Sequence, residues 1–266
     1  MIRDITVGQY YPSESIIHDL DPRFKILASF IYMISIFLVE SIVGYLIVTL
    51  FVFLVIKCSK IPLKYILKGL KPIMMVIIFA FVINVFFTPG TAMFQYGFIK
   101  ITNEGLYRGF FMVIRLVYLI VGTSLLTLTT SPIKLTDGIE KLLNPFKKIG
   151  LPAHELAMMM TISLRFIPTL LEETDKIMKA QMARGADFES GSLINRAKGL
   201  IPLLVPLFIS AFQRADDLAM AMEARCYRGG DNRTTMKVLK YERRDLIATF
   251  ILIIYIIFLF LFKMIV

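Results

Sequence analysis

The stretch LIATFILIIYIIFLFLFKMIV, residues 246–266, holds one charged residue, Lys263, in an almost unbroken run of apolar side chains. A helix of about 20 such residues is long enough to cross the hydrocarbon core of a membrane. The whole chain shares this bias, because 57% of its 266 residues are hydrophobic, 19% are charged and the mean hydropathy is +0.71. Soluble domains have roughly 45–50% apolar and about 25% charged residues. The sequence therefore predicts an all-α integral membrane protein.

Four further apolar runs precede this C-terminal segment. Glu40 separates the first two runs, and Lys25 and Lys57 can extend them by placing charged ends at the headgroups. The four runs cover residues 26–39, 41–56, 72–88 and 116–132. We therefore predict about five transmembrane helices. An alternative for residues 26–56 is one re-entrant hairpin, although a charged apex at Glu40 suits a short turn outside the membrane better.

The basic residues predict how these helices are oriented. Residues 57–71 contain five lysines and no acidic residue, whereas residues 89–105 contain only Lys100 and Glu104 as charged residues. Loops rich in lysine and arginine stay on the cytoplasmic side, so we expect the N-terminus inside and the C-terminus outside. The lysines of residues 57–71 recur at helical spacing, which fits either a short helix on the inner leaflet or a solvated lysine face.

Several classes of function are disfavoured. The net charge of +10 fits an anionic membrane surface, and no motif indicates nucleic-acid binding. The two cysteines, Cys58 and Cys226, lie beside basic residues on the predicted cytoplasmic side, where a structural disulfide is not expected. The chain has no phosphate-binding Gly-rich loop and no zinc-binding His-Glu-x-x-His helix, so it is not expected to be an enzyme. A self-contained secondary transporter remains the alternative, although the nearly charge-free runs lack a midplane pocket.

The middle of the chain differs from both ends. We divide the sequence into a region with four spans at residues 1–132, a cytoplasmic-side region at 133–240, and a last span at 241–266. The middle region is punctuated by prolines and rich in methionine and charge, which predicts two long amphipathic helices at the inner membrane surface. The first helix carries an apolar stripe at helical spacing, formed by Met160, Leu164, Ile167, Leu171, Met178 and Met182.

Both amphipathic helices end in a similar triplet. The two triplets are Ala183-Arg184-Gly185 and Ala224-Arg225-Cys226. The alanine keeps the helix narrow, the arginine offers a planar fork of donors, and a glycine allows the chain to leave in a left-handed cap. One such triplet alone is usually an ordinary helix end, because basic residues and glycine are common there. Two triplets on neighbouring helices favour a paired docking surface.

These motifs, together with two others, resemble the transmembrane T component of energy-coupling factor transporters. The resemblance extends over almost the whole chain. It rests on His18-Asp19-Leu20-Asp21-Pro22-Arg23-Phe24-Lys25, on Ser163-Leu164-Arg165-Phe166-Ile167-Pro168 followed by Glu172 and Glu173, on Gln181-Met182-Ala183-Arg184-Gly185-Ala186-Asp187, and on the second Ala-Arg pair. The second triplet ends in Cys226 where the family has glycine, so the cap geometry there needs to be tested.

The resemblance implies a scaffold in the cell membrane of a prokaryote. It would link two ABC-type ATPase subunits to a membrane-embedded substrate-binding S component for a vitamin or trace metal, and the S component could be one of several. Arg184 and Arg225 would each dock on one ATPase, and the part of the apolar stripe from Met160 to Met178 would contact the S component. The chain itself would need no cofactor or metal, because ATP would bind to the partner subunits.

Four polar features receive structural interpretations. We expect Arg115 to support packing, with an intramembrane functional charge as the alternative, and Asn84 to form a hydrogen bond between helices rather than to bind a ligand. We expect Arg165 to pair with Glu172 and Glu173. Asp21 is expected to cap the first spanning helix, with Pro22 in its first turn.

Overall fold

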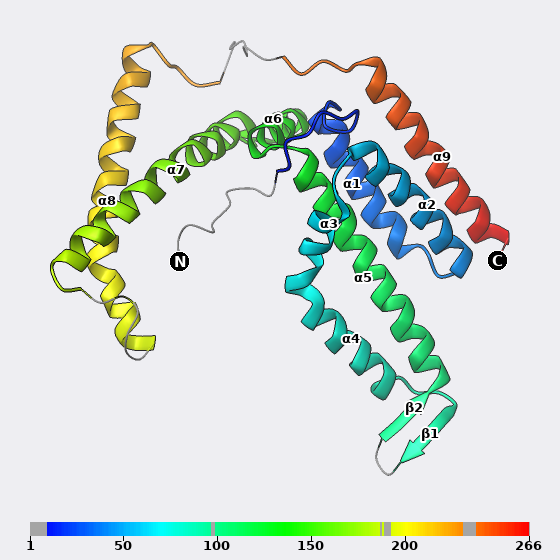
Figure 1. Cartoon of the computed structure of the whole chain (residues 1–266). Helices are drawn as coiled ribbons and strands as arrows, with labels where there is room; N and C mark the ends of the chain where they lie inside the picture. The colour runs from blue at the N-terminus through cyan, green and yellow to red at the C-terminus, as the bar shows by residue number, and fades with distance from the viewer. Residues whose placement is uncertain (1–9, 97–98, 187, 189–192, 231–237, 266) are drawn as a thin grey trace. The chain divides into compact units, whose positions relative to one another are not determined.

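A computed structural model (Figure 1) describes residues 10–96, 99–186, 188, 193–230 and 238–265. The chain forms two compact units, which we describe separately. The bundle unit contains Gln9–Ile139 and Leu239–Val266, and the arm unit contains Glu140–Val238.

The bundle unit consists of helices joined by short connections. Its elements are α1 (Pro22–Phe37), α2 (Ile42–Ser59), α3 (Leu63–Leu70), the 3-10 turn η2 (Lys71–Ile73), α4 (Met74–Phe87), β1 (Ala92–Tyr96), β2 (Ile99–Thr102), α5 (Asn103–Thr129) and α9 (Arg243–Ile265). Helix α6 (Pro132–Leu143) continues from the bundle unit into the arm unit, which contains the 3-10 turn η3 (Asn144–Ile149), α7 (Ala153–Ala183) and α8 (Leu193–Ala224).

The core of the bundle unit lies where α1, α2, α5 and α9 meet. Ile36 and Val48 are fully buried there, and Tyr32 and Tyr255 are nearly so. The Tyr32 hydroxyl donates to the Tyr118 carbonyl of α5, and Ser35 of α1 shares a 2.9 Å hydrogen bond with Tyr255 of α9. These three hydroxyls therefore have partners, which a low-dielectric interior requires.

The start of α1 is held by its cap and by a second helix. Asp21 caps α1, since its carboxylate accepts from Arg23 N at 2.8 Å and Pro22 follows as the first helical residue. Asp245, at the start of α9, accepts from Asp21 N at 2.8 Å. The ammonium of Lys25 donates to the carbonyls of His18 and Thr129. The expected cap is confirmed, and it was readable from the sequence because capping depends on residue types at neighbouring positions.

One short β-hairpin interrupts the expected all-helical architecture. Strands β1 and β2 pair antiparallel, with Ala92 opposite Thr102 and Tyr96 opposite Ile99. They lie between α4 and α5, in the loop at residues 89–105 that was predicted to face outside. The loop is long enough to satisfy part of its own backbone through this pairing.

Five helical stretches in the described part of the chain are long and apolar enough to cross a membrane. They are Ile42–Ser59, Leu63–Phe87, Asn103–Thr129, Gly199–Ala224 and Arg243–Lys263. The expected number is confirmed, but the members differ from the sequence prediction. Helix α1 has 16 residues and so a length of only about 24 Å, whereas Gly199–Ala224, predicted as an amphipathic helix, qualifies by its apolar first half.

Helix α3 contains Lys64 and Lys68, two of the five lysines for which we expected either a short surface helix or a solvated lysine face. Its buried residues are Ile66 and Leu70, while Lys64 and Lys68 are exposed on the other side. Gly69 comes so close to Ser124 of α5 that a Cβ atom there would lie 2.9 Å from the serine oxygen. The helix is therefore packed against α5 on one face and presents its lysines on the other.

Two polar residues of the spans have the structural roles predicted for them. Arg115 on α5 donates to the Val39 carbonyl at 3.1 Å and to the Tyr45 hydroxyl at 3.4 Å. It thereby joins α5 to the connection between α1 and α2. Asn84 on α4 donates to the Met112 sulfur of α5 at 2.9 Å, which is the expected contact between helices.

Candidate functional site

Helices α7 and α8 carry both Ala-Arg triplets. They are the longest helices of the arm unit, with 31 and 32 residues. Pro168 lies inside α7, and Pro202 and Pro206 lie inside α8. A proline removes one backbone donor and tends to bend a helix, and all three prolines precede the last turns that carry the triplets.

The end of α7 is a Schellman cap. Gly185 adopts a left-handed φ of 91°, and its N–H donates to the Met182 carbonyl at 2.9 Å. The next N–H, from Ala186, donates to the Gln181 carbonyl at 3.0 Å. This pair of bonds defines the Schellman motif, and it places Arg184 at the point where the helix stops.

The end of α8 has the same geometry although its triplet ends in cysteine. Cys226 has a left-handed φ of 57°, and its N–H donates to the Glu223 carbonyl at 2.8 Å. Tyr227 N donates to the Met222 carbonyl at 3.0 Å. The departure from glycine therefore changes the backbone strain and leaves the cap itself intact, because a non-glycine residue in this region costs energy without being forbidden.

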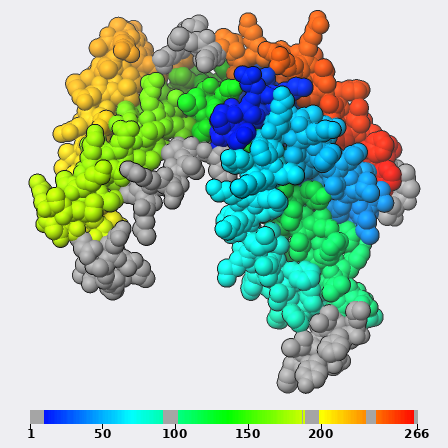
Figure 2. Space-filling model, in the orientation of Figure 1, coloured from blue at the N-terminus to red at the C-terminus, as the bar shows by residue number. Residues whose placement is uncertain are grey.

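The two arginines occupy equivalent, exposed positions. Both triplets are exposed throughout, and the ends of α7 and α8 lie on the surface of the molecule (Figure 2). Within the described part of the chain, neither Arg184 nor Arg225 forms a salt bridge. A cation at a helix C-terminus is favoured by the macrodipole, so each side chain can remain extended while keeping its donors available.

The flanks of the two ends differ in charge. Counting back from each arginine, the positions five and eight residues earlier hold Lys179 and Lys176 on α7 but Met220 and Asp217 on α8. The position two residues earlier is Met182 on α7 and Glu223 on α8. The ends therefore share a backbone shape and present different surroundings to a partner.

Helices α7 and α8 cross within the arm unit (Figure 1), and an ion pair joins them. The Arg214 guanidinium donates to Glu173 Oε2 at 2.6 Å. Hydrogen bonding from Arg214, and then from Ser210, lowers the pKa of the Glu173 carboxyl below its usual range. The expected pairing of Arg165 with Glu172 and Glu173 was wrong for Glu173, and no salt bridge among the described residues involves Arg165. Glu173 faces α8, so a partner on another helix competes with one on its own.

The predicted apolar stripe of α7 is only partly available. Met160 is 36% exposed, whereas Leu164, Ile167, Leu171 and Met178 are half-buried. Met182, at the end of the same stripe, is exposed.

A more exposed stripe lies on α8, and the sequence analysis did not single it out. It consists of Ile201, Leu204, Val205, Phe208 and Phe212, each between 55% and 65% exposed. The spacing of these residues, three or four positions apart, was the signal that could have revealed it. This set is called the α8 stripe below.

The region after the α8 cap returns to the beginning of α7. Gly230 lies so close to the His154 ring that a Cβ atom at this position would overlap it. His154 in turn has its Nδ1 atom 2.9 Å from Glu140 Oε1 of α6. Glycine is needed at residue 230 because of this close approach. The contact ties the exit of α8 to the entry of α7.

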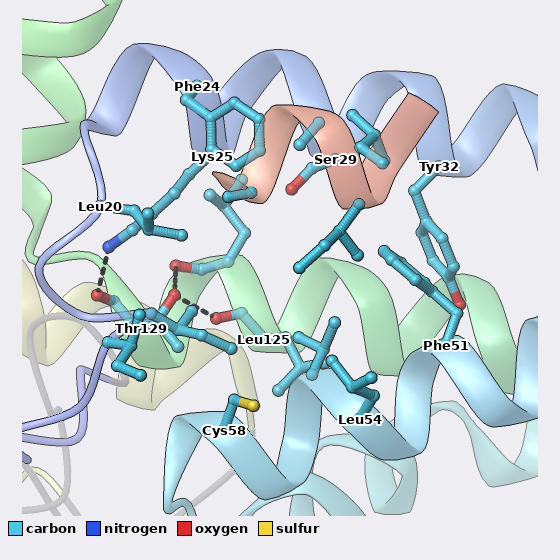
Figure 3. Close-up of a pocket in the computed structure, with 18 of the residues that line it drawn as sticks. Leu20, Phe24, Lys25, Ser29, Tyr32, Phe51, Leu54, Cys58, Leu125 and Thr129 are labelled. Carbon is cyan, nitrogen blue, oxygen red and sulfur yellow. Dashed lines mark hydrogen bonds between the residues drawn. The ribbon is translucent and has the colours of Figure 1, made fainter. Parts of the chain in front are cut away.

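The bundle unit also contains an apolar pocket between α1, α2, α5 and α9 (Figure 3). Phe24, Tyr32, Phe51 and Leu125 line it. The dashed lines in Figure 3 include the bond from the Lys25 ammonium to the Thr129 carbonyl. Because this amine is engaged by the chain's own carbonyls, the pocket resembles a gap between packed helices more than a polar binding site.

Comparison with known proteins fits this arrangement. The family model described as cobalt transport protein, CbiQ, matches residues 13–236. The energy-coupling factor transporter transmembrane protein EcfT of Clostridium kluyveri is 62% identical over 251 residues, which cover 94% of this chain and 93% of the relative. The protein of the same name from Thermosediminibacter oceani is 61% identical over 93% of both chains, and that of Bacillus subtilis strain 168 is 51% identical over 92% of this chain and 93% of its own. The family model covers both helix ends and most of the chain, so the chain belongs to the CbiQ family and, within it, to the transmembrane T components of energy-coupling factor transporters.

Proposed function

We propose that the protein is the membrane scaffold that couples two ABC-type ATPase subunits to a membrane-embedded S component. The observation that carries this proposal is the pair of identical caps that present Arg184 and Arg225 on the surface. Each arginine supplies a planar set of donors suited to carboxylates and carbonyls in a partner groove. A chain with two such ends can hold two partners at once.

The charge difference between the helix ends supports two distinct ATPase surfaces. The α7 end has Lys176 and Lys179 behind its arginine, while the α8 end has Asp217 and Glu223. Opposite charges across an interface increase the association rate and disfavour wrong partners. We therefore expect an acidic rim around the groove for Arg184 and a more basic rim around the groove for Arg225.

The S component is proposed to contact the apolar surfaces of the two long helices. The partly exposed α7 stripe supports this, and the α8 stripe offers a larger uncovered apolar area. Methionine is enriched along both helices, and its flexible thioether can repack against different partners. This would suit several interchangeable S components as well as a single one.

The remaining proposals concern location and cofactors. We place the chain in a prokaryotic cell membrane, with the N-terminus in the cytoplasm and the C-terminus outside, on the basis of the lysine-rich segment at residues 57–71. ATP is proposed to bind only to the partner subunits, and the chain is proposed to need no cofactor or metal of its own. No nucleic acid is expected among its partners.

The experiment reverses both docking charges in the assembled transporter. Arg184→Glu combined with Arg225→Glu should abolish uptake and co-purification of the ATPases while the chain still inserts into the membrane. Arg165→Glu combined with Arg228→Glu is the matched control, since both residues are exposed on the same helices or just beyond them and the net charge changes equally. Uptake by the first double variant at the control's rate would refute the proposal.

A further inference from the structure

The ion pair between Glu173 and Arg214 lies at equivalent positions on the two long helices. Glu173 is eleven residues before Arg184, and Arg214 is eleven residues before Arg225. At about 1.5 Å of rise per residue, each arginine is roughly 16 Å along its helix from the pair. The contact between α7 and α8 therefore falls at the same distance from both exposed helix ends.

The two segments beyond the crossing are regular helix. Residues 173–183 and 214–224 contain no proline or glycine, whereas Pro168, Pro202 and Pro206 all precede the crossing. A continuous ladder of backbone hydrogen bonds resists bending. Motion of either helix end is therefore transmitted to the crossing with little bending of the helix. Motion at the crossing is transmitted to the helix ends in the same way.

Packing alone does not define this crossing. No side chain among residues 158–186 or 204–230 is buried; all are half-buried or exposed. Apolar side chains that remain partly exposed allow neighbouring helices to slide, because no interlocked core holds a single register. A hydrogen-bonded ion pair is directional and admits one register.

Ser210 makes the pair more specific. Its hydroxyl accepts from Arg214 Nε at 3.4 Å and lies one helical turn before that residue, and it also helps to lower the pKa of the Glu173 carboxyl. The Arg214 side chain is 36% exposed and that of Glu173 is 25% exposed. Ion pairs this accessible add little to folding stability, so their loss should affect geometry more than membrane insertion.

We propose that Glu173 and Arg214 are positioning residues that fix where α7 and α8 cross and so set the distance between the two ATPase-docking ends. The pair acts as the common pivot: when the ATPases move the helix ends, both arms turn about one point. This inference rests on the proposed docking of Arg184 and Arg225. It adds a role for a contact that touches neither ATPase nor substrate.

A distance measurement on the full chain in lipid nanodiscs tests the geometry without any partner. Spin labels are placed on the native Cys226 and on Gly185→Cys, in a Cys58→Ser background, because Cys226 shows that cysteine is accommodated at this cap position. The labelled residues are twelve positions beyond Glu173 and Arg214, so two arms of roughly 18 Å bound their separation along the helices at about 36 Å. This distance is within the range of double electron–electron resonance. The expected result is one narrow distance distribution.

Variants then test whether the ion pair between Glu173 and Arg214, and not a neighbouring residue, sets the width of the distance distribution. Glu173→Gln and Arg214→Gln should each widen the distribution at least about twofold, since the remaining contacts do not fix the register. The exchange Glu173→Arg with Arg214→Glu should narrow it again. Glu172→Gln, a neighbouring exposed position, should leave the wild-type width. An unchanged width in Glu173→Gln, or an equal widening in Glu172→Gln, would overturn the proposal.

Transport by the assembled complex provides the second readout. Glu173→Gln should retain the ATPase subunits but reduce uptake per ATP hydrolysed at least about fivefold, and the exchanged pair should recover most of it. Normal uptake per ATP in Glu173→Gln would refute the pivot while leaving docking untouched. Loss of the ATPases from Glu173→Gln would also refute it, because the pair would then act in docking, which the charge reversals at residues 184 and 225 test separately.

Discussion

Replacing Cys226 by glycine should stabilise the α8 cap by relieving its backbone. Cys226 has a φ of 57°, a left-handed conformation that costs an L-residue about 1–2 kcal/mol. Glycine avoids this cost but loses roughly 0.5–1 kcal/mol through its greater freedom when the cap is open. The net gain of about 0.7 kcal/mol corresponds to a roughly threefold shift in the opening equilibrium.

Gly185 at the α7 cap provides the mirror experiment. It has a φ of 91°, and no atom lies within 4 Å of where a Cβ would be placed. Gly185→Ala therefore meets no steric clash, and its effect comes from the backbone alone. We expect its cap to open roughly threefold more often.

Millisecond hydrogen–deuterium exchange measures both effects at the amides that form the caps. In the Cys226→Gly variant, exchange at the amides of residues 226 and 227 should slow about threefold. In the Gly185→Ala variant, exchange at the amides of residues 185 and 186 should accelerate about threefold. Cys226→Ala is the control, because it removes the thiol and keeps the left-handed strain. Equal slowing in the alanine and glycine variants of Cys226 would refute the backbone argument.

Three further predictions concern the bundle unit. Burial lowers the pKa of His18 below its ordinary 6.5, which means that folding favours the neutral imidazole. The contribution of His18 to stability is therefore complete above pH 6.5. It is lost as the pH falls through the lower pKa of the folded state. Between about pH 7.5 and about pH 5.5, the melting temperature in detergent should fall more for the wild type than for His18→Gln. Arg115→Met should destabilise by about 1.5–3 kcal/mol because a buried carbonyl loses its charged donor, whereas the exposed Arg108→Met should leave the melting temperature unchanged. Gly122→Ala should cost about 1–3 kcal/mol because its Cβ would overlap the Tyr32 ring; if adding Tyr32→Leu restores none of the loss, that contact is not the cause.

The membrane-spanning runs were predictable because their signal is local. Hydrocarbon selects for apolar side chains over a fixed length, so composition within a window of about 20 residues is enough to find α2, α4, α5 and α9. The cap at Asp21 and Pro22 was equally readable, since capping depends on neighbours a few residues apart. The short α1 and the qualifying stretch Gly199–Ala224 show the limit of this method, because length and apolar content alone do not assign a helix to the bilayer.

The partner of Glu173 was not predictable from its neighbourhood. The sequence places Arg165 eight residues earlier on the same helix, but Glu173 pairs with Arg214, 41 residues away. Residues one or two turns apart on a helix are the natural first guess, while a contact between helices depends on how those helices cross. The β-hairpin between α4 and α5 was missed for a similar reason, since strand pairing joins segments rather than neighbours.

The sequence by itself determined that this chain is a helical membrane protein of the T-component family and that two Ala-Arg triplets, 41 positions apart, end its long amphipathic helices. Those features depend on residue type and local spacing. The tertiary structure decided that Cys226 forms the same left-handed cap as Gly185 and that α8 carries the more exposed apolar stripe. It also decided that Glu173 pairs with Arg214, each eleven residues before the arginine at the end of its helix. Backbone conformation and contacts between helices arise from how segments pack together, so the order of the residues alone did not reveal them.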